Sequence, residues 1–268
     1  MPAPSPQIAG QESPLDIAAL SRAGFATVVH LREVASTMDA ARSLADPTPL
    51  PAVVVADRQS AGRGRRGAGW WQAPGSLAAS LVVDASASGG PRPVWSLACG
   101  VALAETIALL EPEVEPLLRW PNDVETSGRK LAGILVETLP DRRVVVGIGV
   151  NTTGTAAEAP RAIARRVVTL PDLVGRPLDR TRLLAGFLPR WLDLVAAITA
   201  DPAELVRRYR PRCALAGRVV TIHAGAERRE GVCRGITAAG GLVLETASGV
   251  IECTAGSLTP PGDEWAGD

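Results

Sequence analysis

The chain has 268 residues, a mass of 27.8 kDa and no formal net charge, because 28 basic residues balance 28 acidic ones. This neutrality excludes the basic surface of a dedicated nucleic-acid binder and of a protein held electrostatically at a membrane. Hydrophobic residues make up 46% of the chain, enough to fill a sizeable core, which excludes a disordered tail protein. The length predicts one large domain, or a large domain with a small one.

Lysine and asparagine are almost missing from the composition. Of the 28 basic residues, 27 are Arg and one is Lys130, and the two asparagines are Asn122 and Asn151. The abundance of Ala, Gly, Pro and Arg indicates a GC-rich genome, in which codons that begin with AA are depleted. All three surviving residues lie in the stretch 119–151. We therefore treat their surroundings as candidates for function, with chance clustering as the alternative.

Targeting and cysteine chemistry give few signals. Residues 1–14 contain four prolines but no basic region followed by an apolar one, so we expect a loose leader rather than a secretory signal. The longest apolar helix that we expect, residues 94–110, includes Glu105 and is too short to span a bilayer. The four cysteines form no Cys-x-x-Cys pair, so we interpret them as reduced thiols, buried or incidental. A soluble, cytoplasmic protein is the expectation.

Residues 15–212 are expected to form a sheet with helices. The predicted helices cover 16–23, 38–44 (capped by Ser36 or Thr37), 94–110, 181–198 and 202–209. The predicted strands cover 25–31, 52–56, 77–83, 117–120, 130–137 and 143–150, the last two joined as a hairpin through 139–142. The helix 94–110 reads as amphipathic, and the Gly-Gly-Pro-Arg-Pro turn at 89–93 should fix its start. Because strands occur as neighbours rather than in strict alternation with helices, the fold class is α+β.

The pattern of residue types changes after Pro211. Four short β-branched runs at 218–223, 231–236, 241–246 and 250–254 are separated by turn residues. This close spacing predicts a small C-terminal β-barrel, residues 213–260. Such a barrel is too small for confident independent stability, so we expect it to pack on the main domain.

A glycine-punctuated loop, Gly62-Arg-Gly-Arg-Arg-Gly67, carries three guanidinium groups. Glycine permits tight turns and close backbone approach, and Arg grips phosphate or carboxylate with a planar fork. The loop matches neither the Walker pattern nor the dinucleotide fingerprint. It predicts a site that encloses an anion, with a solvated basic turn or an RNA-touching patch as the alternative.

Two further segments carry polar groups next to predicted strands. Arg119-Trp-Pro-Asn-Asp123 ends a strand at a proline and then displays an amide and a carboxylate, either for chemistry or for a simple Asx turn. Lys130 begins a strand whose apolar run must be buried, which places its ammonium group at the rim of the sheet. Each signal alone is weak, but their clustering favours a functional site.

These motifs together resemble those of biotin protein ligases. The matching segments are Asp57-Arg-Gln-Ser-Ala-Gly-Arg-Gly-Arg-Arg-Gly-Ala-Gly-Trp70, Arg119-Trp-Pro-Asn-Asp-Val124, Gly128-Arg-Lys-Leu-Ala-Gly-Ile-Leu-Val-Glu137 and Gly147-Ile-Gly-Val-Asn151. The resemblance implies a mixed or antiparallel sheet with helices, like that of class II aminoacyl-tRNA synthetases, over 15–212, and an SH3-like barrel over 213–260. It also implies ATP-dependent transfer of biotin, through biotinyl-5′-AMP, to a lysine of a biotin carboxyl carrier domain in the cytoplasm, with ATP and Mg²⁺ as cofactors.

The resemblance also assigns roles to residues. The biotin-binding residues would be Ser36, Thr37, Gln59, Gly62, Arg63, Arg65, Lys130, Gly133 and Leu135. The residues that bind ATP and the adenylate would be Arg63, Arg65, Arg66, Trp70, Asn122, Lys130 and Asn151. The catalytic residues would be Lys130, Arg65 and Asp123, and Asn151 would also bind Mg²⁺.

Within that assignment, each group has a task suited to its chemistry. Arg63 and Arg65 would cover the carboxylate and α-phosphate, Lys130 would reach the same oxygens, and Asp123 would position the acceptor amine. The loop would order on ligand binding and keep water from the mixed anhydride. The hydroxyl and amide groups of Ser36, Thr37 and Gln59 would hydrogen-bond the uncharged ureido ring, while Trp70 would form a wall.

The chain departs from the family pattern in four places. Met38 and Ser76 stand where Asn is frequent, Ala68 where Arg is common and Arg119 where Lys is common. These changes concern affinity more than the type of reaction. Fewer than forty residues precede Ser36, so we expect no winged helix-turn-helix domain and no DNA binding, and we expect no membrane partner.

Two other functions remain open from the sequence. A lipoate or octanoate ligase would use a related fold, but Gln59 and the Trp-Pro-Asn-Asp stretch argue against it. A non-catalytic nucleic-acid-binding protein with an Arg loop is the other alternative. The zero net charge and the 3% aromatic content argue against that function, because base stacking needs aromatic platforms.

Overall fold

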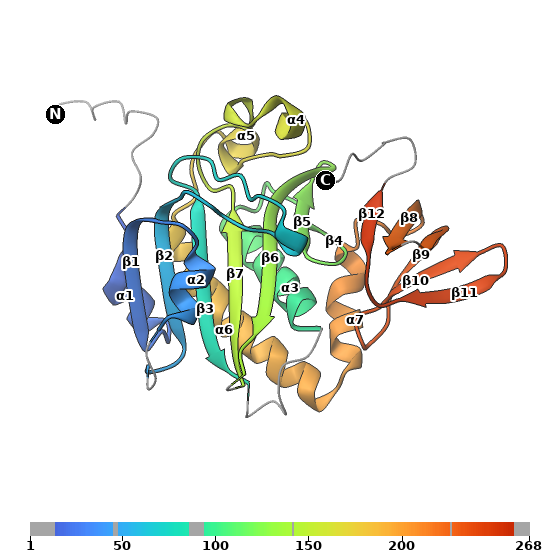
Figure 1. The fold of residues 1–268 in the computed structure, drawn as a ribbon, viewed down its shortest axis with the longest axis horizontal. Helices are drawn as coiled ribbons and strands as arrows, with labels where there is room; N and C mark the ends of the chain where they lie inside the picture. The colour runs from blue at the N-terminus through green and yellow to red at the C-terminus, as the bar shows by residue number, and fades with distance from the viewer. Residues whose placement is uncertain (1–13, 45–47, 86–93, 141, 226, 260–268) are drawn as a thin grey trace.

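The computed structural model describes residues 14–44, 48–85, 94–140, 142–225 and 227–259 (Figure 1). Most of the predicted leader and the turn at 89–93 lie outside the described residues. A seven-stranded sheet forms the centre, in the order β1-β2-β3-β7-β6-β5-β4. Its strands are β1 (Thr27–Val34), β2 (Ala52–Gln59), β3 (Leu77–Asp84), β4 (Leu117–Arg119), β5 (Asp123–Thr126), β6 (Arg129–Thr138) and β7 (Arg143–Val150). Because β1 and β2 are parallel and the other neighbours antiparallel, this is a mixed sheet, and the α+β prediction is confirmed.

Helices cover the sheet unequally. They are α1 (Ile17–Arg22), α2 (Thr37–Arg42), α3 (Val94–Leu110), α4 (Arg161–Ala164), α5 (Leu170–Val174), α6 (Arg180–Ala200) and α7 (Ala203–Tyr209), with 3₁₀ turns at Arg65–Gly67, Ala156–Glu158 and Arg210–Arg212. The long helices α3 and α6 cover one face and enclose the larger core, while the short α2 covers part of the other face over a small core around Met38 (Figure 1). Trp70, from the loop that follows β2, lies over another part of that second face.

The helix α3 is not amphipathic, so that prediction is wrong. Twelve of its seventeen residues are buried, because α3 packs against the sheet on one side and against α6 and α7 on the other. The expectation that α3 is the longest apolar helix is also wrong, since α6 has 21 residues and is long and apolar enough to cross a membrane. In this fold α6 is a core helix: Trp191 stacks on Phe187 at 6.0 Å and meets Trp95 edge-on at 5.8 Å.

Most predicted elements occur close to their predicted bounds, and the differences have local causes. The strand 143–150 and the helix 94–110 match to the residue. The strand β5 was missed, because its four residues Asp123–Thr126 were interpreted as a polar display after a proline. Ser36 does precede α2 as its N-cap, but its hydroxyl makes no capping hydrogen bond. That hydroxyl is consequently left for another partner.

The C-terminal residues form a second, five-stranded antiparallel sheet in the order β11-β10-β9-β8-β12. Its strands are β8 (Val219–Ala224), β9 (Glu227–Ile236), β10 (Leu242–Thr246), β11 (Gly249–Cys253) and β12 (Ser257–Thr259), of which β12 was not predicted. This sheet lies beside β4 and α7 (Figure 1), and the Trp120 Nε1–H donates to the Gly240 carbonyl over 3.0 Å. The expected packing on the main sheet is confirmed.

The cysteines match the expectation of reduced thiols. All four are free, and Cys99, Cys233 and Cys253 are buried. Cys213, where the C-terminal segment begins, hydrogen-bonds to the thiol of Cys233, which lowers the pKa of Cys213 to about 7 and raises the pKa of Cys233.

Candidate active site

Glycines on two central strands leave a floor without side chains on the open face of the sheet. Gly133 of β6 pairs with Gly149 of β7, and the indole of Trp70 lies directly on both. A Cβ atom at Gly149 would stand 2.4 Å from the ring, and one at Gly133 would stand 3.0 Å from it. At the other end, the Met38 sulfur would be 2.6 Å from a Cβ at Gly147. We call the strip Gly133, Gly147 and Gly149 the glycine floor.

A β-bulge brings Lys130 to the same face as Gly133. Residues three apart on a regular strand point to opposite faces. Here Glu125 pairs with Lys130 and Val124 pairs with Ala132, so Leu131 is an extra residue on β6. Leu131 and Ala132 are both fully buried in the core, which leaves Lys130 on the glycine-floor side. Bulges re-aim side chains in this way beside active sites.

The ammonium group of Lys130 lies in a small charged cluster. Its Nζ is 2.7 Å from Oδ1 of Asp123 and 5.4 Å from the centre of the Trp70 ring. Asp123 follows the tight β4–β5 turn, whose Asn122 side chain donates to the Ile134 carbonyl over 2.8 Å. The hairpin therefore holds the carboxylate against the lysine.

The arginine loop folds over this cluster. The Trp70 N–H donates to the Gly62 carbonyl and the Gly64 N–H to the Ala68 carbonyl, which close the loop on itself. The Arg65 guanidinium lies 3.4 Å from the Asn122 side-chain oxygen. Burial and then the charge of Arg66 lower the pKa of Arg65, while Asp123 opposes them. Lys130 pairs with the Asp123 carboxylate, Arg65 lies near it, and Arg66 lies near Arg65, so the cluster carries excess positive charge and suits an anion.

The loop also contacts the C-terminal sheet. Arg65 donates to the Gly256 carbonyl over 3.4 Å, and Arg66 donates to the Ser257 hydroxyl over 2.6 Å. Gly256 has φ of +146° and a Cβ there would lie 2.4 Å from Ile222, so this turn requires glycine. No short-range pattern indicates these contacts, because they join segments 191 residues apart.

An uncharged polar corner lies beside the other end of the glycine floor. The Gln59 Oε1 accepts from the N–H of Thr37 over 2.9 Å and from its hydroxyl over 3.1 Å, while the Ser80 hydroxyl donates to Thr37. These bonds fix the amide so that Nε2 points toward Gly62, where a Cβ would be 3.0 Å away. The Ser36 hydroxyl, 1% exposed, has no hydrogen-bond partner among the described residues. The corner therefore offers an amide donor and a free hydroxyl.

Two predicted site residues lie away from the cluster around Lys130. Arg63 pairs with Asp39 of α2 at 2.6 Å, on the side of the polar corner. Leu135 of β6 packs with the small core around Met38 rather than lying openly on the floor. Both lie at the α2 end of the site.

Asn151 immediately follows β7 and is 1% exposed. Its Nδ2 donates to the Val168 carbonyl over 3.0 Å, and its Oδ1 has no hydrogen-bond partner in the described part of the chain. Such an oxygen fits a hard cation or a hydroxyl donor. The described residues contain no group of three or more His, Cys, Asp or Glu that could hold a metal ion. A magnesium ion would therefore need phosphate oxygens for most of its ligands.

The substitutions noted in the sequence have different surroundings. Arg119 pairs with the buried Glu125 at 3.6 Å, and Ser76 lies 3.4 Å from Thr153.

The sequence analysis missed Gln72, whose side chain hydrogen-bonds to the end of β2, although a glutamine two residues after Trp70 was visible. The Gly-x-Gly pattern of β7 was one of the matching segments, but it was not assigned to a binding surface.

The chain is similar to known proteins in both sequence and fold. A model of the biotin/lipoate A/B protein ligase family matches residues 32–151. The biotin–acetyl-CoA-carboxylase ligase of Mycobacterium tuberculosis is 34% identical over 214 residues, which cover 77% of either chain. The chain belongs to the biotin protein ligase family.

Other members of the biotin protein ligase family agree with this assignment. The biotin–acetyl-CoA-carboxylase ligase of Paracoccus denitrificans is 31% identical over 221 residues, covering 80% of this chain and 92% of the other. A structure of the biotin protein ligase from Aquifex aeolicus, in complex with biotin and ATP, aligns with a TM-score of 0.78 and 27% identity. That alignment covers 88% of this chain and 98% of the Aquifex chain, so the likeness to biotin protein ligases includes the C-terminal sheet.

Proposed function

We propose that this protein uses ATP to attach biotin to a lysine of a biotin carboxyl carrier domain, through biotinyl-5′-AMP. The observation that carries the proposal is the arrangement along the glycine floor. An uncharged polar corner with Ser36 and Gln59 lies at one end, and a cationic cluster with Lys130 and Arg65 lies at the other. Biotin has the matching polarity, with an uncharged ureido ring at one end and a carboxylate at the other.

The polar corner suits the ureido group because the corner holds its unpaired donor and acceptor groups in fixed positions. The Nε2 of Gln59 is a donor for the ureido oxygen, and the Ser36 hydroxyl can accept from a ureido N–H. Thr37 holds Gln59 in this orientation, and Arg63 closes the corner from the loop. Trp70, now lying on Gly133 and Gly149, would pack on the bound ligand as a wall.

The first step joins two anions and needs cations in fixed positions. An oxygen of the biotin carboxylate bonds to the α-phosphorus of ATP, the bond from that phosphorus to the bridging oxygen breaks, and pyrophosphate leaves with the electron pair. Lys130 and Arg65 would stabilise the charge that develops on the α-phosphate oxygens. Asn151 would supply one oxygen ligand to Mg²⁺, which would counter the charge of the leaving pyrophosphate.

The second step transfers the biotinyl group. The acceptor lysine attacks the acyl carbon, AMP leaves with the electron pair of the broken bond, and the amine loses a proton. Asp123, held 2.7 Å from Lys130, would position the incoming amine. The arginine loop, anchored on Gly256 and Ser257, would keep water from the anhydride.

The domain arrangement is part of the proposal. We assign residues 15–212 to the catalytic domain, with the class II synthetase-like architecture, and residues 213–260 to a C-terminal SH3-like barrel. The antiparallel pairing of β8 to β12 supports the barrel, and the pairing of Leu118 with Cys213 and Ala214 ties the start of that segment to β4. We place the reaction in the cytoplasm, where ATP and the carboxylases are found.

Labelled ATP with biotin, lipoate or octanoate tests the function. Adenylate formation with biotin, and transfer to a carboxyl carrier domain, is the expected result. Activation of lipoate or octanoate instead would identify a lipoate-type ligase, which the polar partners at Ser36 and Gln59 argue against. No adenylate with any acid would overturn the proposed function and leave a non-catalytic arginine-loop protein.

A further inference from the structure

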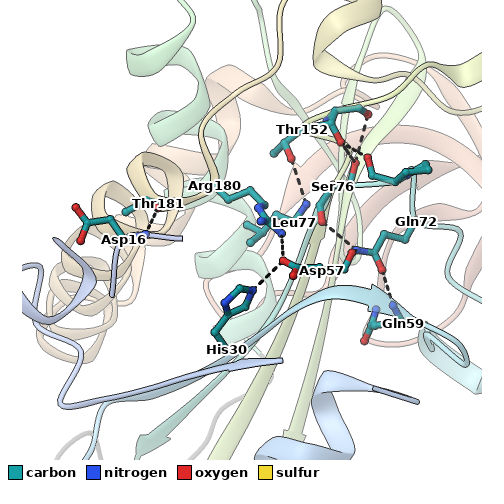
Figure 2. Close-up of polar contacts among 12 residues, drawn as sticks. Asp16, His30, Asp57, Gln59, Gln72, Ser76, Leu77, Thr152, Arg180 and Thr181 are labelled. Carbon is teal, nitrogen blue, oxygen red and sulfur yellow. Dashed lines mark hydrogen bonds and ion pairs between the residues drawn. The ribbon is translucent and has the colours of Figure 1, made fainter. Parts of the chain in front are cut away.

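Gln72 lies between the arginine loop and β3 and uses three of its four hydrogen-bonding positions. Its Oε1 accepts from the N–H of Gln59 over 3.0 Å. Its Nε2 donates to the Asp57 carbonyl over 3.1 Å and to the Ser76 carbonyl over 2.9 Å (Figure 2). Only a carboxamide can serve one N–H and two carbonyls in this geometry, because a carboxylate has no donor and a hydrocarbon has neither.

The two bonds to β2 replace strand pairing that has ended. The pairing of β2 with β3 stops at Ala56 opposite Ala78. The Ser60 N–H donates to Val34 of β1, so by alternation the backbone groups of Asp57 and Gln59 point to the opposite side, where β3 would continue. Buried backbone groups need partners, and the Gln72 side chain supplies them.

The Asp57 end of this connection is also held from its side chain. Its carboxylate Oδ1 contacts His30 Nε2 at 2.8 Å and Arg180 Nη1 at 2.9 Å (Figure 2), and the Arg180 side chain is 5% exposed. Burial acts to raise the pKa of Asp57, but the bonds with His30 and Arg180 outweigh it and the pKa lies below its ordinary value. The end of β2 is therefore fixed on one side by the partly buried ion pair of Asp57 with Arg180 and on the other by Gln72.

We propose that Gln72 is a positioning residue for biotin, acting through Gln59. This inference rests on the proposed function, because it takes Gln59 as a partner of the ureido ring. The carboxamide of Gln72 fixes the backbone of Gln59, and the Gln59 side chain then meets Thr37 and presents Nε2 to the ligand. Gln72 itself makes no contact with the cluster around Lys130, so its removal affects biotin capture and leaves the chemical step intact.

The test compares two variants of the full-length enzyme in pyrophosphate release. In Gln72→Met, which keeps the length of the side chain, the KM for biotin should rise by about tenfold, as expected for losing a set of aligned hydrogen bonds. The KM for ATP and kcat at saturating biotin should stay near the wild-type values. Gln72→Glu should be worse than Gln72→Met, because its carboxylate oxygen faces the carbonyls of Asp57 and Ser76.

Thr153→Val provides the matched control. Thr153 donates to the Pro74 carbonyl in the same segment, but it has no contact with Gln59. This variant should lose thermal stability comparable to Gln72→Met and keep the wild-type KM for biotin. In Gln72→Met, equal rises in the KM for biotin and for ATP, or an unchanged KM for biotin, would overturn the inference. The proposed function would still stand if the wild type is active with biotin. A wild type inactive with biotin would overturn both.

Discussion

At the scale of single residues, Lys130 is the clearest case of a side chain whose type fits its surroundings. It is the only lysine of the chain, yet Arg would carry the same charge. A compact ammonium group fits beside Asp123 and above Trp70, and its flexible stem allows it to follow an oxygen through a reaction. The planar, forked guanidinium of Arg65 approaches the same region from the loop. The two cations thus differ in shape and in the element that carries them.

We expect Lys130→Met to lower the rate of biotinyl-adenylate formation by at least about a hundredfold, the typical loss for one transition-state donor. Met keeps the length of the side chain and removes its charge. Pyrophosphate release with biotin and ATP measures the rate. Arg129→Met, which removes the preceding cation of β6, is the matched control and should remain close to wild type. Normal pyrophosphate release by Lys130→Met would exclude the ammonium group from the step.

At the scale of secondary-structure elements, two neighbouring strands form the proposed binding surface because they carry glycines, which have no side chain. Gly133 and Gly149 are opposite one another in the register of β6 and β7, and Gly147 lies two residues along β7 on the same face. The bulge at Leu131 then places Lys130 on the edge of that floor. Neither feature depends on a loop, and both are held by the buried face of the same strands.

Gly149→Ala should abolish biotin binding, because the new methyl group would stand 2.4 Å from the position of the Trp70 ring and fill the floor. Isothermal titration with biotin measures the affinity, and thermal unfolding shows that the sheet survives. Gly69→Ala is the control, since a Cβ there meets nothing within 4 Å. Retention of wild-type affinity in Gly149→Ala would mean that biotin does not use this floor.

The strand β5 carries a buried carboxyl group whose burial has a measurable cost. Burial raises the pKa of Glu125 above its ordinary value, against the attraction of Arg119 and Arg218. A raised folded pKa means that folding is favoured when the group is protonated, and this contribution is lost as the pH rises through the folded pKa.

Glu125→Gln removes that titration. The free energy of unfolding of the variant, relative to wild type, should therefore increase as the pH rises through the raised pKa of Glu125. Urea unfolding at a series of pH values measures the difference, and Glu33→Gln, at an exposed position paired with Arg58, is the control. A relative stability that falls with pH would show that the ion pair with Arg119 outweighs burial.

At the scale of the whole molecule, the arginine loop is one of the places where the main part of the chain contacts the C-terminal sheet. Arg65 and Arg66 contact Gly256 and Ser257, so the C-terminal sheet helps to hold the cover of the site. Lysine amines attack the reactive anhydride that this site would make, and the chain carries a single lysine. That lysine is paired with Asp123 inside the site.

Arg65→Gly should release biotinyl-adenylate, because it removes both the cation over the α-phosphate and the contact with Gly256. An added bystander protein should become biotinylated at surface lysines, detected by streptavidin blotting. Mass spectrometry of the enzyme should find side-chain biotin at Lys130 alone, and at low occupancy. Arg58→Gly, at a position 72% exposed and paired with Glu33, is the control and should label the bystander no more than wild type does. Equal labelling by Arg65→Gly and wild type would remove Arg65 from adenylate retention.

The sequence by itself determined the chemistry and most of the elements. Hydrophobic patterns located the long strands and helices: a repeat where one face is buried, and a continuous apolar run where both faces are, as in α3 and β3. The arginine loop, the Asn122-Asp123 pair and Lys130 were visible as residue types that anions require. The tertiary structure alone decided how these groups meet. The bulge that turns Lys130 to the site, the bridge from Gln72 to Gln59 and the anchoring of Arg66 on Ser257 join separate segments. Local patterns record which face of a strand is buried, but pairing between distant segments depends on register and packing, which leave no short-range trace.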